Sequence, residues 1–244
     1  MWRFDPLLRL TVARMSVIIA AGPWVDKRLR IGSHRNVLRR SQLGCDVLST
    51  ANSPVNRVNK NGKHLICAGR LDWFKGLDLA VEALAILPSD HKLTFIGDGP
   101  AHHMLKTLAV EKGLEDRVVF RRSIPRKELL SEFTKHDLML FPSPEVAGLV
   151  WIEALSCGTP VVVFDGMTEA SFAAEKLPGI TIAAVENNRE KNIAHYAEAI
   201  LNALNKQSNR AEIARKVALH YNWDSLAEVF LKTYSKLSSG KNEH

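Results

Sequence analysis

Two glutamates in an apolar stretch of the chain have the type and spacing of groups that could do chemistry. Seven residues separate Glu145 from Glu153, and large apolar residues flank Glu153 on both sides. A helix here is apolar nearly all round and should be buried, and a buried carboxylate without a partner is costly. The sequence therefore predicts that hydrogen-bond donors reach Glu153 from elsewhere, and a bound polar ligand is one candidate.

The local pattern around the glutamates predicts a strand over residues 137–141, a helix over 148–157 and a second strand over 161–164. If the whole segment between the glutamates were helical, the two carboxylates would lie roughly 12 Å apart, at ~1.5 Å per residue. Such a span suits an extended ligand with a phosphate between its ends. The start of a helix presents free N–H groups, which suit an anion. Here these groups belong to Gly148, Leu149 and Val150.

Short apolar segments alternate with helical patterns along the chain from residue 64 onward. The further predicted strands cover residues 64–68, 92–96, 117–120 and 179–183, and the further helices cover 76–87, 101–112, 125–133, 191–204, 208–220 and 223–237. This alternation predicts an α/β fold with a doubly wound parallel sheet, Rossmann-like in type. Ligands of such sheets bind at the carboxyl ends of the strands. Chemically unusual residues follow the predicted strands at those ends: Arg70, Lys75, Gly97, Asp98, Arg122, Ser123, Glu145 and Asp165.

Several short motifs at these positions occur together in one family. They are Cys67-Ala-Gly-Arg-Leu with Lys75-Gly76, Phe95-Ile-Gly-Asp-Gly-Pro100, Phe141-Pro-Ser, the paired glutamates followed by Ala154-Leu155, Gly158-Thr-Pro-Val-Val, and the closing Trp223 and Tyr234. With them the chain resembles, over about residues 61–238, the C-terminal, donor-binding domain of a GT-B glycosyltransferase of family 4, a group of retaining enzymes. Val146 and Ala147 depart from the glycine and phenylalanine that the family often has there, which leaves the identity of the sugar open.

The resemblance implies roles in binding a nucleotide-sugar donor. Arg70, Lys75 and the backbone at Gly148, Leu149 and Val150 would bind the diphosphate. Glu153 would accept hydrogen bonds from the ribose hydroxyls, and Glu145, as the catalytic residue, would bind the transferred sugar beside its anomeric carbon. The base would lie near Gly97, Asp98 and the loop that carries Arg122 and Ser123.

Each of these residues also has a purely structural interpretation. The alternatives are solvated loop charges for Arg70 and Lys75, a turn for Asp98, a charge near a helix N-terminus for Glu145, and a structural ion pair for Glu153. Trp73 and Trp151 are interpreted as core or loop packing residues rather than as platforms for a sugar ring.

The sequence predicts no metal and no further cofactor. It has no Asp-x-Asp pair, and its nine histidines are scattered. Two cations and a helix end would offset the charge of a leaving diphosphate without a metal. A nicotinamide-dependent enzyme is disfavoured, because Gly69-Arg-Leu-Asp follows the first strand of the sheet where a Gly-x-Gly-x-x-Gly motif would be needed.

The basic character of the chain is concentrated in its first quarter. Residues 1–60 carry a net charge of +8, whereas the whole chain carries +7. The remaining residues therefore carry a net charge of −1. A solvated surface is the simplest interpretation, and attraction to an anionic inner-membrane surface is the alternative. Nucleic acid is disfavoured, because no aromatic–basic pattern accompanies the charge. Three cysteines, two of them in predicted core elements, indicate a reducing compartment. We therefore expect a cytoplasmic protein, with peripheral attachment to the inner membrane face as the alternative.

Three parts are expected along the chain. Residues 1–60 resemble the last helix, the last strand (16–20) and the linker (52–61) of an acceptor-binding domain, residues 61–221 form the nucleotide-sugar-binding domain, and residues 222–244 form a C-terminal helix and tail. The strand at 16–20 would then be an orphan edge with poor partners. A truncated gene, an internal start or a split enzyme would account for such a remnant.

Two functions follow from this organisation. The leading one is the donor-binding half of a retaining glycosyltransferase, which moves a hexose from a nucleotide sugar to a glycan or lipid-linked acceptor and needs an N-terminal domain in cis or in trans. The alternative is a non-catalytic nucleotide-sugar-binding module left by truncation. The base, the sugar, the acceptor and the oligomeric state stay open.

Overall fold

The chain divides into two compact units, which are described separately. The structure, a computed structural model, describes residues 10–11, 14–20, 37–39, 44, 63–144, 148–166, 168–206 and 208–238. The larger unit comprises residues 45–220, and the smaller unit comprises residues 1–44 together with 221–244. Within the described ranges, no helix has both the length and the apolar character needed to cross a membrane.

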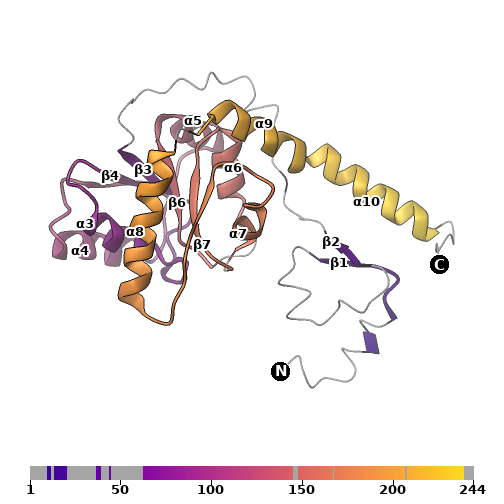
Figure 1. The fold of residues 1–244 in the computed structure, drawn as a ribbon, viewed down its shortest axis with the longest axis horizontal. Coiled ribbons are helices and arrows are strands. Elements are labelled where there is room, and N and C mark those ends of the chain that lie inside the picture. Colours follow the sequence, from indigo (N-terminus) through magenta and orange to yellow (C-terminus); the bar gives the residue numbers. More distant parts are fainter. Residues whose placement is uncertain are drawn as a thin grey trace. The chain divides into compact units, whose positions relative to one another are not determined.

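A six-stranded sheet forms the centre of the larger unit (Figure 1). Its strands are β3 (His64–Ala68), β4 (Lys92–Ile96), β5 (Val118–Arg121), β6 (Leu138–Phe141), β7 (Val161–Phe164) and β8 (Ile180–Ala183). They lie in the order β5-β4-β3-β6-β7-β8, and every neighbouring pair is parallel. Every residue of β6 and β7 is buried, as their continuous apolar sequences require. The predicted α/β fold with a parallel sheet is therefore confirmed.

Helices cover both faces of this sheet. They are α3 (Leu77–Ile86), α4 (His102–Glu111), α5 (Arg126–Lys135), α6 (Val150–Ser156), α7 (Glu169–Ala173), α8 (Arg189–Asn205) and α9 (Arg210–His220), with the short 3-10 helix η3 (Trp73–Lys75). Alternate strand residues such as Cys67 and Phe95 share one core with α3, α4 and α8. Side chains alternate between the two faces of a strand. The intervening residues, such as Ile66 and Met139, therefore face the side on which α5, α6 and α9 pack together.

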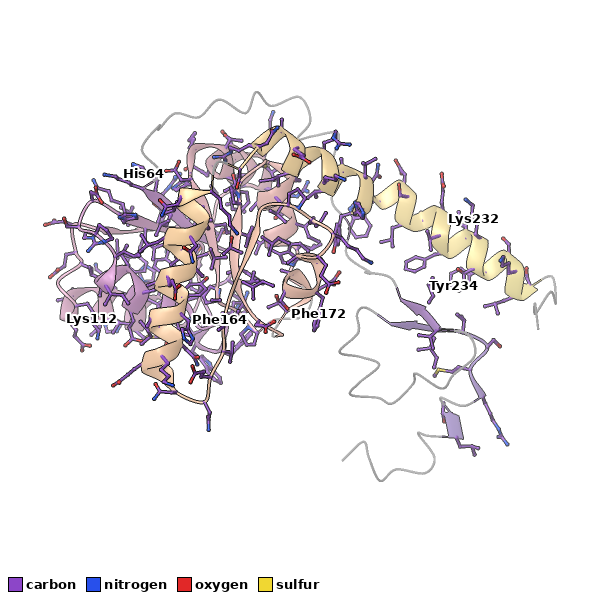
Figure 2. All side chains as sticks on the ribbon, in the orientation of Figure 1. His64, Lys112, Phe164, Phe172, Lys232 and Tyr234 are labelled. Atoms are coloured by element: carbon purple, nitrogen blue, oxygen red, sulfur yellow. The ribbon has the colours of Figure 1, made fainter. Side chains whose placement is uncertain are left out.

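Phe164 shows how α8 closes over one face of the sheet. Figure 2 shows this residue at the end of β7 beside α8, where its ring stacks on Tyr196 with the ring centroids 4.6 Å apart. The Tyr196 hydroxyl donates to the Val162 carbonyl at 3.1 Å. Burial raises the pKa of the Tyr196 phenol, so this hydroxyl stays protonated and keeps its hydrogen bond.

The order of the strands reverses between β3 and β6. The chain runs outward from β3 to β4 and β5, and then returns to place β6 on the other side of β3. The His64 N–H donates to Oδ2 of Asp137 at 3.0 Å, and the Asp137 N–H donates to the His64 carbonyl at 2.8 Å. In Figure 2, His64 marks the amino edge of the sheet and Phe164 the opposite, carboxyl edge. In open α/β sheets, ligands bind at the carboxyl edge where the order reverses.

A buried arginine, Arg210, joins the start of α9 to the end of α5 and to the turn before β7. Its guanidinium donates to the carbonyls of His136 and Phe133 at 3.0 and 3.2 Å and also to the hydroxyl of Thr159. The Thr159 hydroxyl in turn donates to the Phe133 carbonyl at 2.6 Å. Arg210 is only 9% exposed. Loss of this donor would leave buried acceptors unsatisfied. The free-energy penalty of an unsatisfied buried acceptor is larger than the net stabilisation that its hydrogen bond provides.

His136, which follows α5 directly, is expected to make the fold less stable in mild acid. It is 7% exposed, and its Nδ1 lies 2.8 Å from the Glu132 carbonyl. Burial lowers the pKa of His136, although the Glu132 carbonyl opposes this effect. Because the folded-state pKa is depressed, the unfolded chain binds the proton first as the pH falls below about 6.5. The free energy of unfolding should therefore fall by up to ~1.4 kcal/mol per pH unit until the folded ring is also protonated.

Urea unfolding of the wild type and of His136→Gln, from about pH 8 down to about pH 5, checks this expectation. The carboxylates contribute equally to both proteins, so the difference between the two curves isolates the histidine. The wild type should lose more stability than the variant over this range. Parallel curves would contradict a buried, neutral His136.

The smaller unit contains a two-stranded parallel sheet, in which β1 (Ile18–Ala20) pairs with β2 (Val37–Arg39), and helix α10 (Trp223–Ser238). The expectation that the strand at 16–20 is an orphan edge is wrong, because β2 pairs with β1 over three residues. The three residues of β2 are too short a pattern to predict a strand. The predicted linker over 52–61 and most of the first sixty residues lie outside the described ranges.

Candidate functional site

The loops that follow β3 and β4 are joined by backbone hydrogen bonds at the carboxyl edge of the sheet. The Gly69 N–H donates to the Ile96 carbonyl at 3.0 Å, and the Leu71 N–H donates to the Asp98 carbonyl at 2.9 Å. These bonds continue the pairing of β3 and β4 beyond the ends of the strands. The two loops therefore keep fixed positions relative to each other.

Both glycines of the Gly-Asp-Gly-Pro motif are required by this close approach. A Cβ atom at Gly97 would lie 2.0 Å from the carbonyl oxygen of Gly69, and one at Gly99 would lie 2.3 Å from that of Leu71. Gly97 and Gly99 also have φ angles of +149° and +159°, which side-chain-bearing residues rarely adopt. The motif therefore has a packing reason that is independent of any ligand.

Arg70 and Lys75 lie around a small hollow between the end of β3 and the end of β6. Gly69, Phe141 and Ser143 also line it. The Arg70 side chain is 71% exposed, and its Nε lies 3.0 Å from Oδ2 of Asp72. The structure thus brings the two predicted cations together at the point where the strand order reverses.

Asp98 links the loop after β4 to the loop after β5. Its Oδ2 accepts a hydrogen bond from the Ser123 N–H at 3.0 Å, and its Oδ1 lies 3.9 Å from Nε of Arg122. The Arg122 side chain is 96% exposed, so this second contact is weak. The carboxylate of Asp98 therefore shapes the loop that carries Ser123, and it places Gly97, Asp98 and Ser123 at one end of the carboxyl edge.

Helix α6 begins at Val150, two residues later than the predicted start at Gly148. Gly148 is buried, and Leu149, the N-cap, is 41% exposed. The N–H groups predicted to bind an anion therefore lie just before the helix and at its first residue. These positions include N–H groups that have no partner within the helix.

Glu153 has an ionic partner in Arg126, the first residue of α5. The Nε of Arg126 donates to Oε1 of Glu153 at 2.7 Å, and the two side chains are 48% and 13% exposed, respectively. The prediction that a donor reaches Glu153 from elsewhere is confirmed, and this donor is a protein side chain, as in the ion-pair interpretation. Sequence analysis did not single out Arg126. Its position directly after Pro125, at the start of a helix that follows a strand of the sheet, is the signal that could have found it.

Glu145, the predicted catalytic residue, lies with Val146 and Ala147 outside the described ranges. The residues that flank this segment are described: Pro144 is exposed and Gly148 is buried. Pro144 and Gly148 both lie between the end of β6 and the start of α6, at the carboxyl edge of the sheet.

The aromatic residues near this edge differ in exposure. Trp151 is fully buried, which confirms its interpretation as a packing residue. Trp73 is 73% exposed, so packing does not account for it, and its ring meets that of Phe74 edge to face with the centroids 6.0 Å apart.

In the described part of the chain, no three His, Cys, Asp or Glu side chains gather in a way that could hold a metal ion.

The parallel sheet, with its candidate site where the strand order reverses between β3 and β6, is typical of one class of protein. The structure of HepE from Anabaena in complex with UDP and glucose aligns with this chain at a TM-score of 0.70 and 20% identity, covering 96% of this chain and 68% of that one. The chain has the fold of the C-terminal half of a GT-B glycosyltransferase.

The chain belongs to the family described as glycosyl transferases group 1, whose model matches residues 49–218. It is 32% identical over 184 residues to a D-inositol 3-phosphate glycosyltransferase of Arthrobacter sp. (strain FB24). That alignment covers 70% of this chain and 42% of that relative. It is 31% identical over 140 residues to a GDP-mannose-dependent alpha-(1-6)-phosphatidylinositol monomannoside mannosyltransferase of Mycolicibacterium smegmatis. That alignment covers 49% of this chain and 37% of that relative. The chain thus spans less than half the length of these relatives. Because both are named as transferases, they do not favour a non-catalytic module.

Proposed function

We propose that this chain is the donor-binding half of a retaining glycosyltransferase that transfers a hexose from a nucleotide sugar to a glycan or a lipid-linked acceptor. The observation that carries the proposal is the meeting of Arg70 and Lys75 at the point where the strand order reverses, in a member of a glycosyltransferase family. The complex of HepE with UDP and glucose supports a nucleotide-sugar donor. The mannosyltransferase that is named for a phosphatidylinositol mannoside supports a lipid-linked acceptor.

In this proposal each part of the carboxyl edge binds one part of the donor. The diphosphate is bound by Arg70, Lys75 and the N–H groups of Gly148, Leu149 and Val150. Glu153 accepts hydrogen bonds from the ribose hydroxyls, and the base lies near Gly97, Asp98 and Ser123. Glu145 binds the transferred sugar beside its anomeric carbon.

The chemistry of the proposed reaction is the departure of a nucleoside diphosphate from that carbon. Negative charge grows on the diphosphate as the bond breaks, and fixed cations and backbone N–H groups stabilise it. The exposed guanidinium of Arg70 and the ammonium of Lys75 supply this charge without a metal ion. A carboxylate at Glu145 would stabilise the positive charge that develops on the anomeric carbon.

The organisation of the whole protein is part of the proposal. Residues 61–221 form the donor domain, residues 222–244 form a C-terminal helix and tail, and residues 1–60 are the end of an acceptor-binding domain with its linker. An acceptor domain in cis or in trans completes the enzyme, since holding two substrates together contributes ~7–11 kcal/mol to lowering a barrier. We place the protein in the cytoplasm, with the basic residues 1–60 facing the anionic inner surface of the membrane.

The chain is expected to bind a nucleoside diphosphate without added metal. Isothermal calorimetry with UDP, GDP and ADP, each with and without a chelator, measures this. At least one of the three should bind, and the chelator should leave its affinity unchanged. Arg70→Met should weaken that affinity about tenfold or more, because it removes a charge-assisted contact to phosphate.

Arg215→Met is the matched control for Arg70→Met, since Arg215 is an exposed arginine on α9 and takes no part in the proposed site. It should bind like the wild type. Failure of all three nucleotides to bind at millimolar concentration would refute the proposal, as would binding that disappears with the chelator.

A further inference from the structure

We propose that Arg126 is a positioning residue for ribose recognition, because its ion pair with Glu153 fixes the carboxylate that receives the ribose hydroxyls. The inference rests on the proposed function, since it requires that the ribose of a nucleotide reaches Glu153. It adds a residue from another helix to the site, and it predicts a property that can be measured separately from nucleotide binding as such.

Within the described part of the chain, the carboxylate of Glu153 has one polar partner. Trp151, Ile152, Ala154 and Leu155, its neighbours on α6, are all fully buried. Glu153 itself is 13% exposed, so its carboxylate reaches solvent through a limited opening. Among the described residues, Arg126 is its one hydrogen-bond donor, and the bond is made through Oε1. The second oxygen, Oε2, therefore remains available to a ligand.

The position of Arg126 is fixed by the backbone around it. The N–H groups of Glu128 and Leu129 donate to the Pro125 carbonyl at 2.9 and 3.0 Å, which starts α5 immediately at Arg126. The other end of α5 is held by Arg210, and α5 packs against α6. Arg126 also follows Ser123 by three residues, so one continuous segment carries both the proposed base contact and the partner of the proposed ribose contact.

An arginine in this position does two things for a carboxylate that binds a diol. A charge-assisted N–H···O bond holds the carboxylate in one orientation, so less conformational freedom is lost when the ribose binds. The cation also offsets the charge of the carboxylate once the ribose has displaced water from it. Both effects act on the hydroxyl contacts and leave the phosphate contacts alone. A guanidinium that bound phosphate directly would instead affect nucleotides with and without the 2′-hydroxyl equally.

The test compares UDP with 2′-deoxy-UDP by calorimetry on the full chain, or GDP with 2′-deoxy-GDP if guanine is the base that binds. The wild type should prefer the ribonucleotide about tenfold or more, the worth of a hydrogen bond to a charged acceptor. Arg126→Met should reduce this preference to about threefold or less while it changes the affinity for the deoxynucleotide by less than about threefold. Arg126→Lys should restore part of the preference, because it keeps the charge and loses the planar fork.

Matched variants complete the design. Lys127→Met removes the neighbouring exposed charge and should keep the wild-type preference. Glu153→Gln should lose the preference, and the double variant Arg126→Met/Glu153→Gln should lose no more than Glu153→Gln alone, because the two residues act as one unit. Thermal unfolding of each variant verifies that the fold is intact.

The outcomes separate the inference from the proposed function. A wild type that binds the ribonucleotide preferentially, with a preference that Arg126→Met leaves unchanged, overturns the inference and leaves the proposed function standing. An equal loss for both nucleotides in Arg126→Met overturns it as well, because it assigns Arg126 to phosphate binding or to folding. A wild type that binds neither nucleotide overturns the proposed function and the inference together.

Discussion

Replacing Gly97 with alanine is expected to lower the free energy of unfolding by about 3–5 kcal/mol and to abolish nucleotide binding. The new Cβ would lie 2.0 Å from the Gly69 carbonyl oxygen, which belongs to backbone and cannot rotate away. The loops after β3 and β4 would have to separate, which would break the hydrogen bond from the Gly69 N–H to the Ile96 carbonyl. Arg70 is the next residue in the displaced loop, so the proposed phosphate site would be displaced with it. Urea unfolding and calorimetry with a nucleoside diphosphate measure the two effects.

Gly113→Ala is the control for this substitution. Gly113 also has a positive φ, of +65°, but nothing lies within 4 Å of the position that its Cβ would take. It should therefore cost only the backbone strain of a left-handed residue, about 1–2 kcal/mol, and should leave nucleotide binding intact. Similar losses of stability in the two variants would contradict the close approach of the two loops.

Replacing Arg210 with methionine is expected to lower the free energy of unfolding by about 3–5 kcal/mol. Methionine fills much of the same volume but donates no hydrogen bonds, so the carbonyl of His136 and the hydroxyl of Thr159 would each lose a buried donor. The hydrogen bond from Thr159 to the Phe133 carbonyl would remain, but the start of α9 would lose its guanidinium bonds to the end of α5 and to the turn before β7. The loss should appear as a lower urea midpoint with an unchanged slope, because the surface exposed on unfolding stays the same.

Arg210→Lys tests whether charge or geometry matters at this position. Lysine keeps the positive charge but lacks the planar fork that reaches several acceptors at once, so we expect it to recover less than half of the loss. Arg215→Met, an exposed substitution on the same helix, should change stability by less than about 0.5 kcal/mol. A loss below about 1 kcal/mol in Arg210→Met would show that the guanidinium bonds are not structurally important.

The sheet could be predicted from the sequence because its strands are short, apolar and separated by clear turn signals. The predictions for 64–68, 92–96 and 161–164 match β3, β4 and β7 residue for residue. The carboxyl-edge location of Arg70, Lys75, Gly97 and Asp98 followed from the same pattern, since each follows a strand of a parallel sheet. Periodicity could not reveal η3, α7 or β2, because three to five residues are too few to show a period.

The partner of Glu153 could not be predicted from local pattern. The apolar residues around it correctly indicated burial, but an ion pair between residues on two different helices depends on how those helices pack. The same limit applies to Arg210, which looks like an ordinary helix N-terminal residue and is in fact a buried link to residues more than 50 positions earlier in the chain. Long-range polar contacts of this kind are specified by tertiary structure alone.

The pairing of β3 with β6 has a consequence for the order in which the parts of this domain fold. It joins residues 73 positions apart in the chain, so it forms only after a long loop has closed. The segment up to β5 contains Arg70, Lys75 and Gly97, and the segment from β6 onward contains Gly148 and Glu153. Neither segment alone therefore holds all parts of the proposed donor site. A nucleoside diphosphate would therefore bind only the assembled sheet and would stabilise it by mass action. Its binding would report when the two halves of the sheet have joined during folding.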